Sequence, residues 1–140
     1  MTYEEYLEKN QTMTYRNVGV SMLPLLRQGR DLFTVEKKTK ERCKVGDVVL
    51  YRRPPQSYVL HRVIKVRKDD YVILGDNCVQ KEYGIKEDDI IGVMTGFVRN
   101  GKEHSTSEMG YKIYVFLILH TIPLRVFVKM VYAKLRSMRK

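Results

Sequence analysis

Ser21 and His61 are the two residues whose types and settings could carry out chemistry together. Ser21 lies in Gly19-Val20-Ser21-Met22-Leu23-Pro24, where Gly19 permits a positive φ and Pro24 fixes the chain after the bend. A tight bend can expose a hydroxyl and point backbone N–H groups at one place, which a nucleophile and its oxyanion site both need. On its own this pattern is typical of an ordinary turn.

A serine becomes a nucleophile only when a base removes its proton, so the histidines come next. His104 is expected in a polar loop after the last strand, and His120 in an apolar helical stretch. His61 lies in the middle of a predicted strand, on the same face as Val59 and Val63 because side chains alternate along a strand. Neutral imidazole, with an ordinary pKa of about 6.5, is a suitable general base near neutral pH. His61 is therefore the candidate base.

The imidazolium formed in such a reaction needs an anionic neighbour. Two residues are candidates: Asp76, in Leu74-Gly75-Asp76-Asn77 at the end of a strand, and Glu82, six residues further on. The residues themselves leave both alternatives open. Cys43 and Cys78 lack the close spacing of zinc ligands, so the cysteines indicate neither a zinc site nor a disulfide framework, and no motif calls for a cofactor.

The elements that must position these residues are mostly strands. Thr2-Tyr3-Glu4-Glu5 fits a capping box and predicts a short helix over about residues 3–10. Alternating and β-branched stretches predict five strands, and Asn100-Gly101 is expected to close the β region. The predicted strands are Leu32–Glu36, Val48–Tyr51, Tyr58–Val66, Tyr71–Leu74 and Ile90–Val98. Short strands with no helix between them indicate a coiled β-sheet or barrel, so the fold class is mainly β.

The net charge of +10 is concentrated at the C-terminal end. Residues 111–140 contain seven lysines and arginines and no acidic residue. Their apolar run Ile113–Leu124 is shorter than the roughly 20 residues that span a membrane. Basic and apolar residues together predict an amphipathic helix, kinked near Pro123, that lies on an anionic membrane. The alternative is a helix that covers the β domain. Because aliphatic residues interrupt the basic ones, we expect no nucleic-acid partner.

These elements divide the 140 residues into three parts. Residues 1–16 are expected to be a helical lead, residues 17–104 a β catalytic domain, and residues 111–140 a membrane-associating tail. The first 16 residues contain Glu4, Glu5 and Glu8 and no apolar run, so they are not expected to be a signal peptide.

Several short stretches together resemble the type I signal peptidases, specifically the branch of the endoplasmic reticulum, archaea and sporulating bacteria. The similarity runs from about residue 19 to residue 96. The matching motifs, in chain order, are Ser21-Met22-Leu23-Pro24, Gly46-Asp47-Val48-Val49, His61-Arg62-Val63-Ile64, Gly75-Asp76-Asn77 and Gly92-Val93-Met94-Thr95-Gly96. The histidine at position 61 selects this branch, because the bacterial branch and the related self-cleaving repressors have lysine there.

The resemblance implies a serine endopeptidase that cleaves signal or leader peptides after small residues, without a metal. It implies that Ser21 is the nucleophile and His61 the general base. The acidic member of the family's site follows Gly-Asp-Asn by a few residues, close to Glu82 here. Asp76 is also retained in the family, so both acids stay candidates.

The resemblance also implies a substrate site. Small residues before the cut imply shallow apolar pockets lined by Met22 and Leu23. Many relatives have a serine at the position of Gly19, where its hydroxyl helps to hold the oxyanion. With glycine there, backbone N–H groups, chiefly that of Ser21, would have to suffice, and loss of one donor costs about 3 kcal/mol.

Location and activity each have two interpretations. The protein is expected to be membrane-associated, either peripherally or through a C-terminal anchor, and the side of the membrane stays open. The β domain either is translocated and removes signal peptides, or acts in the cytosol on the leader of another small peptide. The alternative to a peptidase is a catalytically inactive relative that binds peptides or membranes.

Overall fold

The computed structural model describes residues 2–55 and 57–139. The fold is mainly β, as the sequence predicts, with a short helix before the sheet and two helices after it. The strands are β1 (Thr12–Arg16), β2 (Leu32–Lys37), β3 (Val48–Arg53), β4 (Ser57–Val66), β5 (Tyr71–Leu74), β6 (Glu82–Ile85), β7 (Ile90–Arg99) and β8 (Lys102–Ser105). The helices are α1 (Tyr3–Asn10), the short 3-10 helix η1 (Glu87–Asp89), α2 (Met109–His120) and α3 (Ile122–Met138).

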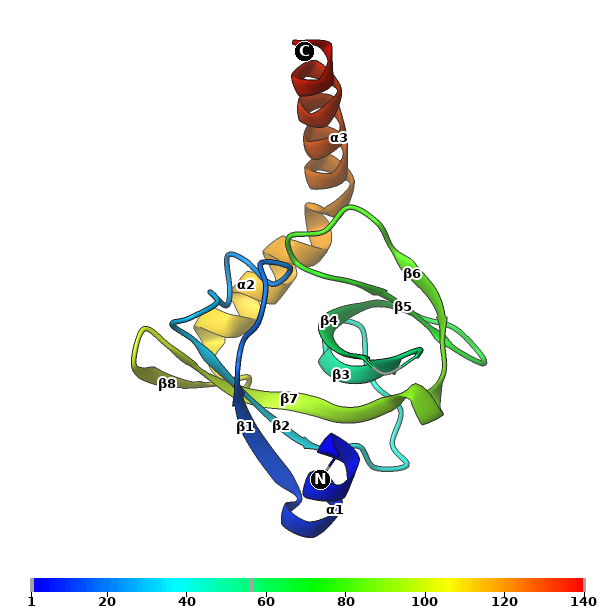
Figure 1. Cartoon of the computed structure of the whole chain (residues 1–140), viewed down its shortest axis with the longest axis vertical. Helices are drawn as coiled ribbons and strands as arrows, with labels where there is room; N and C mark the ends of the chain where they lie inside the picture. The colour runs from blue at the N-terminus through cyan, green and yellow to red at the C-terminus, as the bar shows by residue number, and fades with distance from the viewer. Residues whose placement is uncertain (1, 56, 140) are drawn as a thin grey trace.

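All pairings in the sheet are antiparallel, in the order β1-β2-β7-β3-β4-β5-β6, and β8 also pairs with β7. The sheet curls but stays open, with β1 and β6 at its two ends (Figure 1). Strand β3 lies in the middle, and its residues Val48 to Tyr51 are all buried. Val48 and Leu50 belong to one apolar cluster, whereas Val49 and Tyr51 belong to a second. The core therefore lies on both sides of β3.

Helix α1 begins with the predicted capping box. The Glu5 N–H donates to Thr2 Oγ1 at 3.1 Å, and the Thr2 N–H donates to Glu5 Oε2 at 3.4 Å. These bonds satisfy N–H groups that the first helical turn leaves free. Leu7, 1 % exposed, then anchors the helix in the core. The predicted helix over residues 3–10 is confirmed.

Three edge strands differ from the sequence predictions. Strand β1 pairs with β2, so residues 12–16 belong to the sheet and the predicted boundary between residues 16 and 17 is wrong. Asn100 and Gly101, with φ of 54° and 81°, form a tight turn into β8 rather than closing the β region. His104 therefore lies on β8, stacked on Phe97 with ring centroids 5.1 Å apart, and not in a loop. The third unpredicted strand, β6, contains Glu82.

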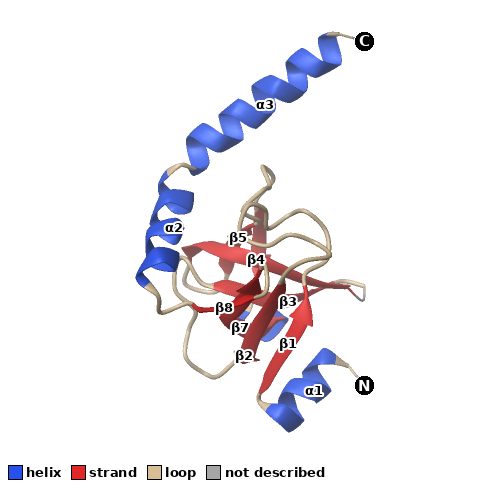
Figure 2. Ribbon diagram, turned by 90° about the vertical axis from the view of Figure 1, so that its left-hand side faces the viewer, coloured by secondary structure: helices blue, strands red, loops and turns tan. Residues whose placement is uncertain are grey.

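The two C-terminal helices differ in how they meet the sheet (Figure 2). Helix α2 packs against the β domain through Tyr111 and Tyr114, and Ile118 is buried. Helix α3 leaves α2 at a bend of 60°, next to Pro123, as predicted, and projects from the domain. In the described part of the chain, no single helix is long and apolar enough to cross a membrane, although α2 and α3 taken together pass that test.

Candidate active site

The turn that contains Ser21 is held by the loop after β5. The Asn77 N–H donates to the Ser21 carbonyl oxygen at 2.8 Å, and Asn77 Nδ2 donates to the Val20 carbonyl oxygen at 3.0 Å. The Gly-Asp-Asn stretch thus fixes the backbone of the serine turn across more than 50 residues of sequence. Ser21 itself is half-buried and faces a cleft.

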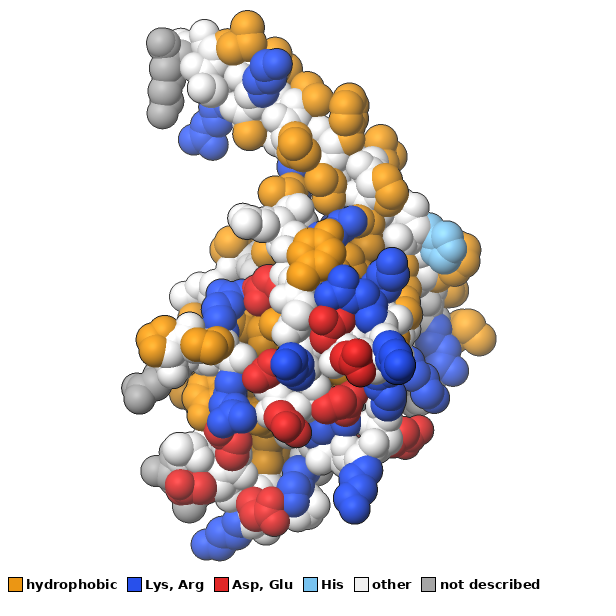
Figure 3. All heavy atoms as spheres, turned by 90° about the vertical axis from the view of Figure 1, so that its right-hand side faces the viewer, with side chains coloured by type: hydrophobic (Ala, Val, Ile, Leu, Met, Phe, Trp, Pro, Cys, Tyr) orange, Lys and Arg blue, Asp and Glu red, His pale blue; other side chains and the backbone are white. Residues whose placement is uncertain are grey.

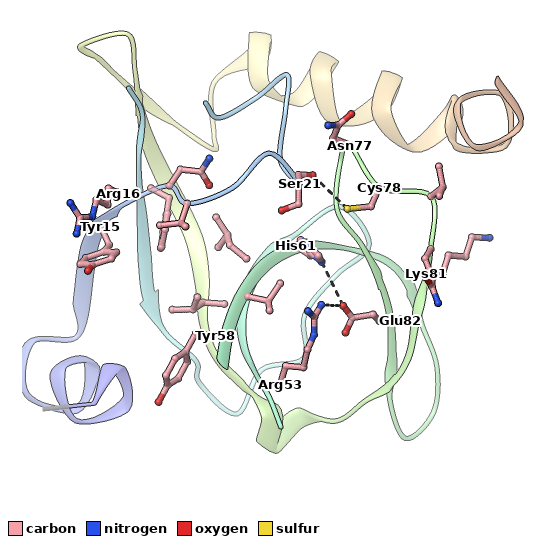
Figure 4. Close-up of a pocket in the computed structure, with 18 of the residues that line it drawn as sticks. Tyr15, Arg16, Ser21, Arg53, Tyr58, His61, Asn77, Cys78, Lys81 and Glu82 are labelled. Carbon is pink, nitrogen blue, oxygen red and sulfur yellow. Dashed lines mark hydrogen bonds and ion pairs between the residues drawn. The ribbon is translucent and has the colours of Figure 1, made fainter. Parts of the chain in front are cut away.

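His61 comes to the same cleft from the middle of β4. His61 is 8 % exposed. Val63, on the same face of the strand, is fully buried, as the alternation of side chains predicted. His61 Nδ1 lies 3.3 Å from the Tyr51 hydroxyl and 3.9 Å from Glu82 Oε1. Nδ1 therefore has its polar neighbours, among them Glu82, on the side of the ring away from Ser21 (Figure 4).

Gly75 sets how the serine turn and the imidazole approach each other. A side-chain carbon on Gly75 would lie 2.9 Å from the Ser21 carbonyl oxygen and 3.0 Å from His61 Cδ2. Because Cδ2 is bonded to Nε2, this edge of the ring is the one next to the serine turn. The absence of a side chain at position 75 lets the two segments come together. Nε2 is thus the ring nitrogen suited to act as base.

Within the described residues, Ser21 makes no side-chain hydrogen bond and its N–H has no acceptor. No hydrogen bond therefore joins Ser21 Oγ to His61 in this structure, and such bonds are often long or absent in sites without ligand. The free Ser21 N–H remains available to an oxyanion.

The structure separates the two candidate acids. Glu82 begins β6 and lies beside His61, where it also pairs with Arg53. Asp76 is 3 % exposed and accepts from Arg62 Nε and Nη2, both at 2.8 Å, and from the Tyr114 hydroxyl at 2.7 Å. Since Arg62 is fully buried, the Asp76 carboxylate is its counter-ion. Of the two acids, Glu82 is the one whose carboxylate lies beside His61 Nδ1.

Burial is the main cause that lowers the pKa of His61 to about 4, the positive charge of Arg53 lowers it further, and Asp76 acts in the opposite direction. The imidazole is thus neutral at neutral pH, the form in which it can accept a proton. Burial also raises the pKa of Tyr51 to about 12, so its hydroxyl stays protonated and uncharged beside Nδ1.

Ser21, His61 and Glu82 line one cleft of about 990 Å³ (Figure 4). Its walls come from the serine turn, the first four strands, β6 and the loop before it, and helices α1 and α3. The remaining lining residues are Tyr3, Tyr15, Arg16, Asn17, Val18, Phe33, Leu50, Arg53, Tyr58, Val59, Leu60, Asn77, Cys78, Val79, Gln80, Lys81, Lys129, Met130 and Ala133.

The predicted substrate residues lie elsewhere. Met22 is 1 % exposed in the apolar core, and neither it nor Leu23 is among the described residues that line the cleft. The expected pocket lined by these two side chains is therefore corrected: the cleft has apolar lining residues on β3 and β4 instead, such as Leu50 and Leu60. Gly19 is also not among the described residues that line the cleft; its φ is +83° and its N–H donates to Gln28 Oε1 at 2.7 Å. A serine there would be strained.

Sequence reasoning missed Tyr51, which contacts His61 from behind the cleft, and two parts of the cleft wall, Arg53 and α3. The hairpin of β3 and β4 could have identified the first two, because Val49 is opposite His61 and side chains alternate. The position of Lys129 and Met130 of α3 in the cleft wall depends on tertiary packing alone. Among the described residues, no cluster of His, Cys, Asp and Glu could hold a metal ion.

Comparisons with known proteins add no relative. No family model, no curated protein and no solved structure matches this chain.

Proposed function

We propose that the protein is a serine endopeptidase of the type I signal peptidase kind, which cleaves precursor or leader peptides after a small residue. The observation that carries the proposal is the meeting of Ser21 and His61 in one cleft, from a turn and a strand 40 positions apart in sequence. A neutral, buried imidazole with an acid behind it is the arrangement that activates a serine.

In the proposed reaction, His61 Nε2 takes the proton of Ser21 Oγ as this oxygen attacks the scissile carbonyl. The Ser21 N–H donates to the oxyanion. The Tyr51 oxygen accepts from Nδ1–H, and the nearby negative charge of Glu82 stabilises the imidazolium. His61 then gives its proton to the leaving amine, and the C–N bond breaks to leave an acyl-enzyme. A water, deprotonated by His61, releases the acyl group and restores Ser21.

The experiment that tests the proposal is incubation of the purified protein with a panel of precursor and leader peptides, read by mass spectrometry. We expect wild type to cut after a small residue and Ser21→Ala to leave the same peptide intact. If both proteins give the same products, the cleavage does not depend on Ser21 and the proposal fails.

A pH profile tests the role of Arg53. Protonated His61 cannot act as base. We therefore expect kcat/KM to fall on the acid side near pH 4, the pKa of His61 in the free enzyme. Arg53→Gln removes a charge that lowers this pKa and frees Glu82, so the acid limb should move upward, by up to about one pH unit. Arg52→Gln, on the other face of β3, is the control and should not move it. If the acid limb lies at the same pH in Arg53→Gln as in wild type, this assignment of the base is wrong.

We also propose that α3 binds an anionic membrane surface. Its apolar stripe of exposed side chains lies opposite the face that lines the cleft, by the helical period of 3.6 residues. The stripe is Leu124, Phe127, Val128, Val131, Leu135 and Met138. Figure 3 shows hydrophobic and basic side chains on this helix, whereas acidic and basic side chains mix on the β domain.

Binding to lipid vesicles measures the contribution of this apolar stripe to membrane affinity. Phe127→Gln combined with Leu135→Gln should lower partitioning onto phosphatidylglycerol vesicles at least about tenfold, because each side chain would bury its area in the interface. Tyr83→Gln, a change of an exposed apolar residue of β6 outside the cleft, should change little. Equal partitioning of wild type and the double variant would exclude the stripe as the membrane contact.

A further inference from the structure

The charges that line the cleft are almost all positive. Arg16, Arg53, Lys81 and Lys129 line it, and Glu82 is the one acidic residue among the described residues that do. Glu82 is already paired with Arg53. Three positive charges therefore remain uncompensated around the candidate dyad.

Elsewhere on the β domain, carboxylates neutralise many of the basic side chains. The ion pairs outside the cleft are Arg30–Asp31, Lys37–Glu8, Lys38–Glu87, Arg42–Glu87, Arg52–Glu4 and Arg67–Asp70, with the buried pair Arg62–Asp76. No described carboxylate lies within ion-pair distance of Arg16, Lys81 or Lys129. Unpaired lysines and arginines also occur outside the cleft, so what distinguishes the cleft is that three of them line one site whose single described acidic residue is already paired.

The positions of these cations follow from the open sheet. Arg16 ends β1 and Lys81 precedes β6, the two strands at opposite ends of the sheet. Figure 4 shows Arg16 on one side of the cleft and Lys81 on the other, with Ser21 and His61 between them. Lys129 reaches the cleft from α3, where its Nζ donates to the Asn77 carbonyl oxygen at 2.5 Å. That acceptor is neutral, so the charge of Lys129 persists.

Part of the cleft lining is apolar. Leu50 and Leu60, which are opposite each other on β3 and β4, and Val59 line the cleft and are close to His61 in the hairpin. A peptide that crosses this cleft would place uncharged residues at the dyad and its more distant residues near the cations.

We infer that the substrate of this cleft is a peptide with acidic side chains on both sides of a small, uncharged cleavage segment, bound by Arg16 and Lys81 at the two ends and by Lys129. This inference rests on the proposed peptidase function and names its substrate class. Exposed charges contribute modestly each, but several of one sign in a cleft raise both affinity and association rate, and salt weakens the effect.

The test separates binding from cleavage. The inactive Ser21→Ala protein is titrated into three fluorescein-labelled peptides that share one Ala-rich centre and differ only in flanks of glutamate, glutamine or lysine, with anisotropy as the readout. We expect the glutamate peptide to bind at least about tenfold more tightly than the lysine peptide at low salt, with a difference that shrinks as salt rises. Arg16→Gln with Lys81→Gln, added to Ser21→Ala, should reduce the preference several-fold. Lys102→Gln, a basic residue of β8 outside the cleft, is the matched control.

The outcomes distinguish the inference from the proposed function. Equal binding of the three peptides, or a preference that survives the Arg16 and Lys81 substitutions, overturns the inference, whether or not wild type cleaves any peptide. Acidic preference without cleavage by wild type upholds the inference as a binding specificity and counts against the peptidase. If the two substitutions lower binding to phosphatidylglycerol vesicles and leave peptide binding unchanged, the cations serve a lipid surface and the inference is wrong.

Discussion

Replacing His61 with glutamine is expected to lower kcat by about 10³-fold or more, because glutamine can fill the site but cannot take the proton of Ser21. The side chain is almost fully buried, at the centre of β4, and no other described histidine lines the cleft. Kinetics on a peptide that wild type cleaves measure the loss, and circular dichroism checks that the variant is folded.

His104→Gln is the control for this change, because His104 lies on β8 and stacks on Phe97 outside the cleft. It should leave kcat within about twofold of wild type. A His61→Gln variant that is folded and keeps most of the activity would mean that another group deprotonates Ser21.

The second large effect concerns stability. Asp76→Asn should lower the free energy of unfolding by about 3–5 kcal/mol, because it leaves the charge of Arg62 buried without its counter-ion. The same carboxylate accepts from Tyr114, so the substitution should also weaken the docking of α2. Urea unfolding followed by circular dichroism measures the loss.

Glu82→Gln is the matched comparison, since Glu82 is the other candidate acid and its pair with Arg53 is partly exposed. It should change stability by less than about 1 kcal/mol and act mainly on kcat. A stable Asp76→Asn protein that has lost activity would assign the catalytic carboxylate to Asp76 and contradict the division of roles seen in the structure.

The sequence predicted the strands that carry their own apolar pattern and missed those that do not. Strands β3, β4, β5 and β7 are rich in β-branched residues and buried on at least one face, which makes them recognisable. Strand β8, Lys102–Ser105, is polar throughout and exists because it pairs with β7. Such edge strands depend on a neighbour rather than on intrinsic propensity.

The candidate site shows the same limit. Ser21 and His61 could be selected from residue type and setting. The choice between Asp76 and Glu82 could not, because it depends on where Arg62 points. Neighbouring residues on a strand face opposite ways, so His61 faces the cleft while Arg62 faces Asp76 and α2. The lysine from α3 likewise enters the cleft only through the packing of the tail.

The most direct test of the central claim is to look for the acyl-enzyme. The protein is mixed with the p-nitrophenyl ester of a short peptide that ends in alanine, and nitrophenolate release and intact protein mass are followed together. The account predicts an initial burst and the added mass of the acyl group at Ser21, both absent from Ser21→Ala and strongly slowed in His61→Gln. Release without a burst or added mass in wild type, or an adduct that persists in Ser21→Ala, would contradict it.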